Sequence, residues 1–137
     1  MFKKDNKYSD EIISSTCLLL SIAHSDEKLE KNEIECIKEI IVDFFNVEKI
    51  DIDKIIDISL DKFKQSTDLF EFSKHLNTSF TYQDKIDFIC CAFEVSISDG
   101  KVHYLEDFFI KKIANTLNVK HRDLIKAKKT IQSQLIL

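Results

Sequence analysis

Apolar residues recur along the chain at the spacing of amphipathic helices. From about Ser9 to His24 they fall three and four residues apart, which places them on one helical face. Six further stretches repeat this period, and their expected apolar faces begin at Ile34, Ile52, Leu69, Tyr82, Leu105 and Leu124. The pattern therefore predicts seven helices.

Most aromatic residues fall on these expected faces and are assigned to the core. They include Phe70, Tyr82 and the pair Phe108–Phe109. An alternative for the Phe pairs is that one member faces outward and forms a patch for a homodimer.

Capping chemistry predicts several helix ends. Ser9 precedes two acidic residues and is an expected N-cap. Asn46 is expected to end the second helix, which runs from about Lys31 to Phe45. Thr81 and Asp84 have the spacing of a capping box. One Gly and no Pro leave little chemistry for tight hairpins, so short polar links between helices are expected.

One stretch also matches a β-hairpin. Residues 95–104 alternate apolar and polar positions around Asp99-Gly100, which is typical of such a turn. Two observations favour helices instead. The equivalent earlier stretch has Glu27 where a hairpin needs Gly, and both arms continue into a longer helical period.

A motif occurs twice in the chain, with a constant offset of 73 positions from Asp26 to Asp99. In each copy an apolar stretch ends at Ser-Asp, an aliphatic residue follows three positions after the Asp, and a Glu follows seven positions after it. This repeat indicates two related helical hairpins. The expected fold is an all-α orthogonal bundle of about seven helices with a pseudo-twofold repeat, in a single domain over residues 1–137.

Composition narrows the function classes. Hydrophobic residues at 44% and charged residues at 32% are ordinary for a soluble globular domain. The charges are mixed and the net charge is −4, so nucleic acid is not an expected partner. The start lacks the apolar stretch of a signal peptide. The basic last segment, residues 120–129, is expected to be a solvated face, with contact to an acidic partner or to a membrane surface as alternatives.

The four cysteines lie inside apolar helical patterns and form no C-x-x-C pair; they are Cys17, Cys36, Cys90 and Cys91. This placement predicts reduced, buried thiols in a cytoplasmic protein. Zinc is not expected, because the Cys/His spacing of a zinc site is missing.

The repeated acidic residues have a purely structural interpretation. Asp26 and Asp99 lie where one helix must end and another begin, so each can cap the following helix. Glu33 and Glu106 lie near the start of that helix and can reach back to brace the turn.

The two copies resemble the motif of the tellurite-resistance TerB-like family, which also includes the N-terminal domain of DjlA-type co-chaperones. That motif is Ala-Asp-Gly-x-Ile/Val followed by a Glu, given twice in an all-helical domain. The matching stretches are Ser98-Asp99-Gly100-Lys101-Val102 with Glu106, and Ser25-Asp26-Glu27-Lys28-Leu29 with Glu33. The resemblance covers residues 9 to 135, although Ser replaces Ala and the first copy lacks the Gly.

The resemblance implies a non-enzymatic scaffold or sensing module of the stress response that binds a partner protein. It also implies a divalent cation, calcium or magnesium, at Asp26, Glu33, Asp99 and Glu106, and carboxylates are the ligands that such hard cations prefer. One alternative is a metal-dependent hydrolase, for which no supporting base or oxyanion donor is recognisable, so no catalytic residue is assigned. The other is an interaction module without a ligand, in which the carboxylates are only caps.

Overall fold

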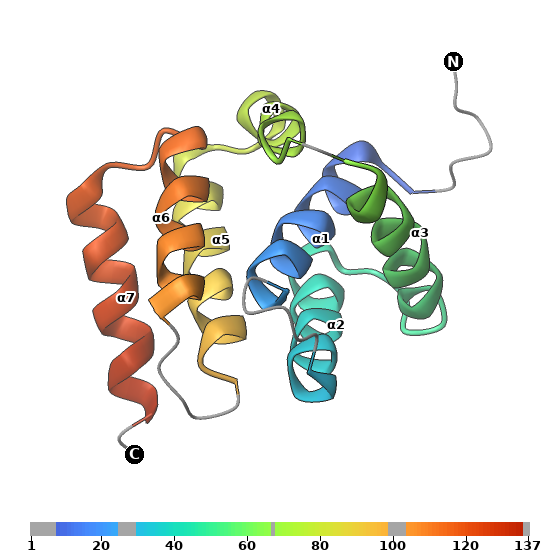
Figure 1. Ribbon diagram of the computed structural model, residues 1–137, viewed down its shortest axis with the longest axis horizontal. Coiled ribbons are helices and arrows are strands. Elements are labelled where there is room, and N and C mark those ends of the chain that lie inside the picture. Colours follow the sequence, from blue (N-terminus) through green and yellow to red (C-terminus); the bar gives the residue numbers. More distant parts are fainter. Residues whose placement is uncertain (1–7, 25–29, 67, 99–103, 136–137) are drawn as a thin grey trace.

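A computed structural model describes residues 8–24, 30–66, 68–98 and 104–135, and within these ranges the chain forms seven helices and no strand (Figure 1). None of the described helices combines the length and the apolar composition needed to cross a bilayer. The helices are α1 (Asp10–Ala23), α2 (Lys31–Phe45), α3 (Ile52–Gln65), α4 (Phe70–Ser79), α5 (Tyr82–Ser96), α6 (Tyr104–Thr116) and α7 (His121–Leu135). The all-α bundle expected from the sequence is confirmed.

The first helix is the centre of the bundle. α1 contacts α2, α3, α4, α5 and α6, and its residues from Ile13 to Ala23 are all buried. The second repeat copy forms the hairpin α5–α6, which packs on the first hairpin α1–α2 through contacts of α1 with α5 and α6 and of α2 with α5. In Figure 1, α5, α6 and α7 lie side by side at one end of the molecule, and α4 lies between them and α3.

The expected caps are present. The Ser9 side chain accepts a hydrogen bond from the Ile12 N–H at 3.3 Å. Asn46 ends α2 in the left-handed conformation with φ 54°, a geometry that Asn tolerates better than most residues. Thr81 and Asp84 bond each other's backbone N–H groups at 3.1 and 3.0 Å, which completes the capping box.

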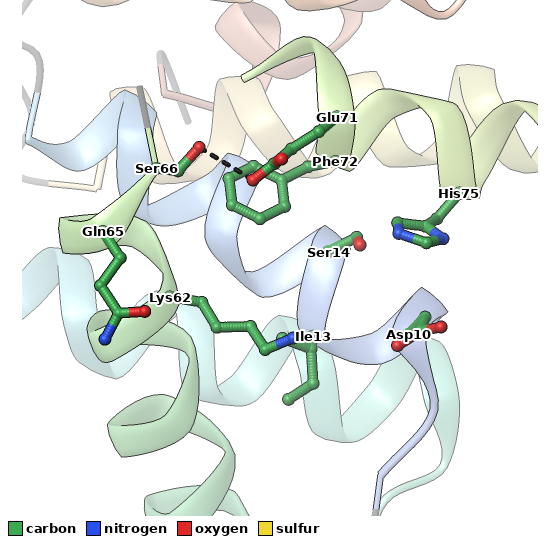
Figure 2. Close-up of a pocket in the computed structure, with 9 residues that line it drawn as sticks. All are labelled: Asp10, Ile13, Ser14, Lys62, Gln65, Ser66, Glu71, Phe72 and His75. Atoms are coloured by element: carbon green, nitrogen blue, oxygen red, sulfur yellow. Dashed lines mark hydrogen bonds between the residues drawn. The ribbon is translucent and has the colours of Figure 1, made fainter. Parts of the chain in front are cut away.

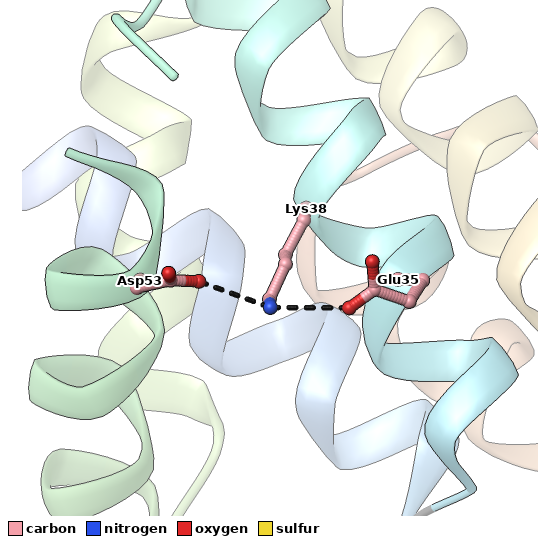
Figure 3. A network of polar contacts seen from close by, with 3 residues as sticks. All are labelled: Glu35, Lys38 and Asp53. Carbon is pink, nitrogen blue, oxygen red and sulfur yellow. Dashed lines mark ion pairs between the residues drawn. The ribbon is translucent and has the colours of Figure 1, made fainter. Parts of the chain in front are cut away.

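Charged side chains join α2 to α3 on the surface. Lys38 Nζ lies 3.1 Å from Glu35 and 3.0 Å from Asp53 (Figure 3). Hydrogen bonds to Asp53 and then to Glu35 raise the pKa of Lys38. Because both carboxylates are exposed, each ion pair contributes less than about 1 kcal/mol to the stability of the fold. The pairs therefore serve mainly to orient α3 against α2.

Several aromatic residues predicted for the core are exposed. The exposed fractions are 50% for Phe70, 39% for Tyr82 and 57% for Phe108, so these three predictions were wrong. Tyr82 lies at the surface because its hydroxyl donates to Asp123 at 2.5 Å and accepts from the Lys120 N–H at 3.0 Å, which ties α5 to the start of α7. The alternative that one member of a Phe pair faces outward is the correct one for Phe108.

The helical interpretation of the ambiguous stretch is confirmed where the structure describes it. Within this stretch, Val95 and Ser96 end α5, Ile97 and Ser98 form a turn, and Tyr104 begins α6, so none of its described residues lies in a strand. Residues 99–103, which include its central Asp-Gly, lie outside the described residues.

Candidate functional site

The two glutamates of the repeated motif are both deeply buried. Glu33 lies in the first turn of α2 and is 1% exposed, and Glu106 lies in the first turn of α6 and is 0% exposed. The two aspartates of the motif, Asp26 and Asp99, lie outside the described residues. The structure therefore places half of the predicted cation ligands, one from each hairpin.

Glu106 joins the two helices of its hairpin. The Ser96 hydroxyl donates a hydrogen bond to Glu106 Oε1 at 3.1 Å, and Ser96 is itself 2% exposed. Ser96 is the last residue of α5 and Glu106 the third of α6, so this bond spans the turn between them. The structural interpretation, in which the Glu braces its turn, is supported for this copy.

The first copy differs at the position of the donor. Counting back 73 positions from Ser96 leads to Ala23, the last residue of α1, which is fully buried and has no hydroxyl. Glu33 therefore keeps its equivalent burial without the hydrogen bond that Ser96 provides in the second copy. Burial of this carboxylate is the feature common to both repeats.

The burial of a glutamate at the same position in both hairpins must be compensated energetically. Glu is almost never fully buried unless it is paired, because an ionised carboxylate loses its hydration. The start of a helix compensates part of this cost, since its free N–H groups and dipole favour negative charge. Both carboxylates lie in such a first turn. A cation or hydrogen-bond donors are the other forms of compensation.

The described residues alone do not form a metal site. Among them, no group of three or more His, Cys, Asp or Glu is arranged to hold a metal ion. The predicted four-carboxylate site includes Asp26 and Asp99, so it stays a prediction. The nearest histidine of the first turn, His24, is an exposed residue at the end of α1, and its ring packs edge-on against Phe63 at 5.6 Å. His103 lies outside the described residues.

The thiols occupy a second region, between α2 and α5. Cys36 and Cys91 line one pocket of about 280 Å³ together with Glu39, Asp43 and Glu94. All four cysteines are free; Cys17 is buried and the other three are half-buried. Burial, and then the charge of Glu94, raises the pKa of Cys36 to about 11 and that of Cys91 to about 12. Burial, assisted by the acidic surroundings, therefore holds these thiols protonated, which opposes redox chemistry at neutral pH.

We expect Cys36 and Cys91 to resist alkylation in the folded protein. At pH 8 their thiolate fractions are more than about 100-fold below that of an ordinary cysteine, and the thiolate is the reacting form. Iodoacetamide labelling followed by peptide mass spectrometry measures the rates, with the chain unfolded in urea as control. The native rates should still rise above pH 9, where labelling of the unfolded chain levels off. Equal rates in the two states would contradict this expectation.

A polar cleft of about 380 Å³ lies between α1, α3 and α4 (Figure 2). Asp10, Ser14 and His75 all line it, and the residue types alone suggest nucleophilic chemistry. No hydrogen bond joins these three side chains, all of which are described, whereas an activated nucleophile depends on such a bond. The hydrogen bond between lining side chains runs from the Ser66 hydroxyl to Glu71 at 3.0 Å. The cleft provides no basis for assigning a catalytic residue.

A fourth region appeared in the sequence analysis only as an alternative, because its aromatic residue was assigned to the core. Phe108 lines a groove between α6 and α7 and is more than half exposed. The available signal was the adjacent pair Phe108–Phe109, whose side chains must point about 100° apart on a helix. After Ile110 the pair is followed by Lys111 and Lys112.

Comparison with protein-family models gives a match over most of the chain. A protein-family model described as Tellurite resistance protein TerB matches residues 13–129, which include both copies of the repeated motif. No significant match was found among curated proteins or among solved structures.

Proposed function

Since the chain belongs to the TerB family of tellurite resistance proteins, we propose that it is a non-enzymatic module that binds a divalent cation at its two acidic turns and a partner protein at its surface. The cation would be calcium or magnesium. Its ligands would come from Glu33 and Glu106, together with Asp26 and Asp99 of the same motif.

The observation that carries this proposal is the burial of one glutamate at the same position in each hairpin. Two exposed glutamates would be ordinary surface residues, but Glu33 and Glu106 are 1% and 0% exposed. Hard cations bind carboxylate oxygens, so the residue types fit calcium and magnesium rather than a thiophilic metal. A bound cation would neutralise the carboxylates and stabilise the start of α2 and of α6.

The proposal assigns no reaction to these carboxylates. Ser96 is a hydroxyl beside Glu106, and in another setting such a pair could act as nucleophile and base. Here the Ser96 side chain belongs to a residue that is 2% exposed, so a substrate cannot reach it. This burial supports a role for the pair in holding the turn together.

A cation titration tests the proposal. The full chain is treated with a chelator and then titrated with calcium or magnesium chloride in a calorimeter, with thermal unfolding measured in parallel. We expect saturable binding and a rising unfolding temperature, since a ligand present at about 100 times its Kd stabilises the native state by about 2.7 kcal/mol.

Matched variants identify the site. Glu106→Gln keeps the shape of the side chain and removes its charge, so it should weaken the response to cations. Glu48→Gln makes the same change at an exposed residue of the α2–α3 link and should respond like the unaltered protein. The proposal fails if millimolar calcium and magnesium produce neither heat nor stabilisation, or if Glu106→Gln binds the cation as tightly as the unaltered protein.

A further inference from the structure

The groove between α6 and α7 combines an apolar lining with a basic rim. It measures about 260 Å³, and Phe93 of α5, Phe108 of α6, and Leu124 and Ile125 of α7 provide its apolar lining. Lys111 of α6 and Lys128 of α7 line it as well. Two helices therefore form its walls and present apolar side chains flanked by amines.

The exposed aromatic residue of this groove is held in place. The rings of Phe108 and Phe109 meet edge to face with centroids 6.0 Å apart. Lys112 Nζ lies 5.6 Å from the first centroid and 5.8 Å from the second, within the range of a cation–π contact. Phe108 nevertheless remains 57% exposed, which leaves a large apolar surface uncovered beside the groove.

Charge is distributed unevenly along the chain. From Phe108 to the end there are seven basic residues and one acidic residue, whereas residues 1–107 contain thirteen basic and twenty-three acidic residues. The chain is acidic as a whole, whereas α7 carries four basic residues and one acidic residue. In α6 the charges balance, with Glu106 and Asp107 against Lys111 and Lys112. A partner for this region is therefore expected to be acidic.

We propose that the groove between α6 and α7 docks an acidic amphipathic helix of a partner protein. Its apolar side chains would pack on Phe108, Leu124 and Ile125, and its Asp and Glu side chains would face Lys111 and Lys128. This is the helix-in-groove mode of recognition, in which anchors at i, i+3, i+4 and i+7 enter an apolar groove. The inference rests on the partner-binding part of the proposed function and gives that partner a surface and a chemistry.

The shape and charge of the groove favour a helix over an anionic membrane. A protein surface that binds a bilayer usually has a protruding apolar face bordered by basic residues. Here the apolar Leu124 is only 5% exposed and lines a recess. Asp107 also lies on the rim, where it pairs with Lys128 at 2.7 Å and would face the lipid headgroups. Both side chains of this pair are partly exposed, so Lys128 can exchange Asp107 for a carboxylate of the partner.

A peptide selection on the full chain tests the proposal. The probe is a displayed library of helix-forming peptides about 16 residues long, which is enough for four turns. We expect enrichment of peptides with Leu, Ile or Phe on one face and Asp or Glu beside it. Fluorescence polarisation of a selected peptide should show binding that weakens as salt is added. Both measurements are made in chelator, so their outcome does not depend on the cation site.

Variants of exposed residues decide whether the groove is the site. Phe108→Ala and Lys111→Glu should each weaken peptide binding at least about tenfold. A tenfold loss corresponds to about 1.4 kcal/mol of binding free energy. Phe70→Ala and Lys74→Glu make the same two changes on α4 and should leave binding unaltered; all four residues are exposed, so folding is preserved.

Three results would overturn the proposal. The first is the absence of acidic amphipathic peptides among those selected, or equal binding by Phe108→Ala. The second is sedimentation of the chain with phosphatidylserine vesicles that Phe108→Ala abolishes, which would assign the groove to a membrane. The third is concentration-dependent self-association that the same variant abolishes, which would assign it to a second copy of the chain.

Discussion

Replacing Leu19 by Ala is expected to lower the free energy of unfolding by about 3 kcal/mol, within the range of about 2–5 kcal/mol that such core truncations cost. Leu19 is fully buried near the middle of α1, the helix that five others contact. A cavity at this position cannot be filled by movement of a surface loop. Urea denaturation followed by circular dichroism measures the change.

The matched control is Ile50→Ala. Ile50 is 84% exposed in the link between α2 and α3, so its truncation should change the free energy of unfolding by less than about 0.5 kcal/mol. If Leu19→Ala cost less than about 1 kcal/mol, α1 would not be the packed centre of the bundle.

The central position of α1 could be predicted from the sequence only in part. The apolar period identified one face, but the structure buries the whole helix from Ile13 onward, including four hydroxyl residues. These small side chains can be buried because some bond their own helix: Thr16 donates to the Ile12 carbonyl at 2.8 Å, and Ser21 to that of Leu18 at 2.6 Å. A periodicity rule counts them as polar and therefore as exposed.

Helix ends were predicted more accurately than helix faces. The predicted bounds of α2 and the caps at Ser9, Asn46 and Thr81 all agree with the structure. Capping is decided by a side chain and a backbone group within a few residues of each other, so the sequence carries the information. Whether Phe108 or Phe109 faces outward depends instead on where α7 lies, which no local rule specifies.

At the candidate site, too, local features could be predicted from the sequence and burial could not. The repeat pointed to Glu33 and Glu106 as equivalent residues, and both lie in first turns as expected. Their burial could not be predicted, because a glutamate in the first turn of a helix is usually a solvated partner of the helix dipole. Burial depends on the tertiary structure around each first turn, which the periodicity of the sequence does not encode.

Replacing Glu106 by Ala is expected to lower the free energy of unfolding in chelator by about 2–4 kcal/mol. The change removes the acceptor of the Ser96 hydroxyl, and an unsatisfied buried donor costs about 1–3 kcal/mol. It also removes buried methylene groups, each worth about 0.8 kcal/mol. Urea denaturation provides the measurement, and a change below about 0.5 kcal/mol would show that Glu106 does not brace its turn.

The repeat itself supplies the control for this prediction. Because Ala23 stands where the second copy has Ser96, Ser96→Ala gives the second copy the residue of the first. Glu106→Ala should cost about 1 kcal/mol less in that background, because no hydroxyl donor is then stranded at this position. Glu106→Gln separates charge from hydrogen bonding, since the amide oxygen can still accept from Ser96. Glu106→Gln could lower the free energy of unfolding only slightly in chelator and still weaken the response to cations. That result would mean that the hydrogen bond stabilises the hairpin and that the negative charge is needed for cation binding. A cost equal to that of Glu106→Ala would mean instead that the ionised carboxylate is itself needed for the fold.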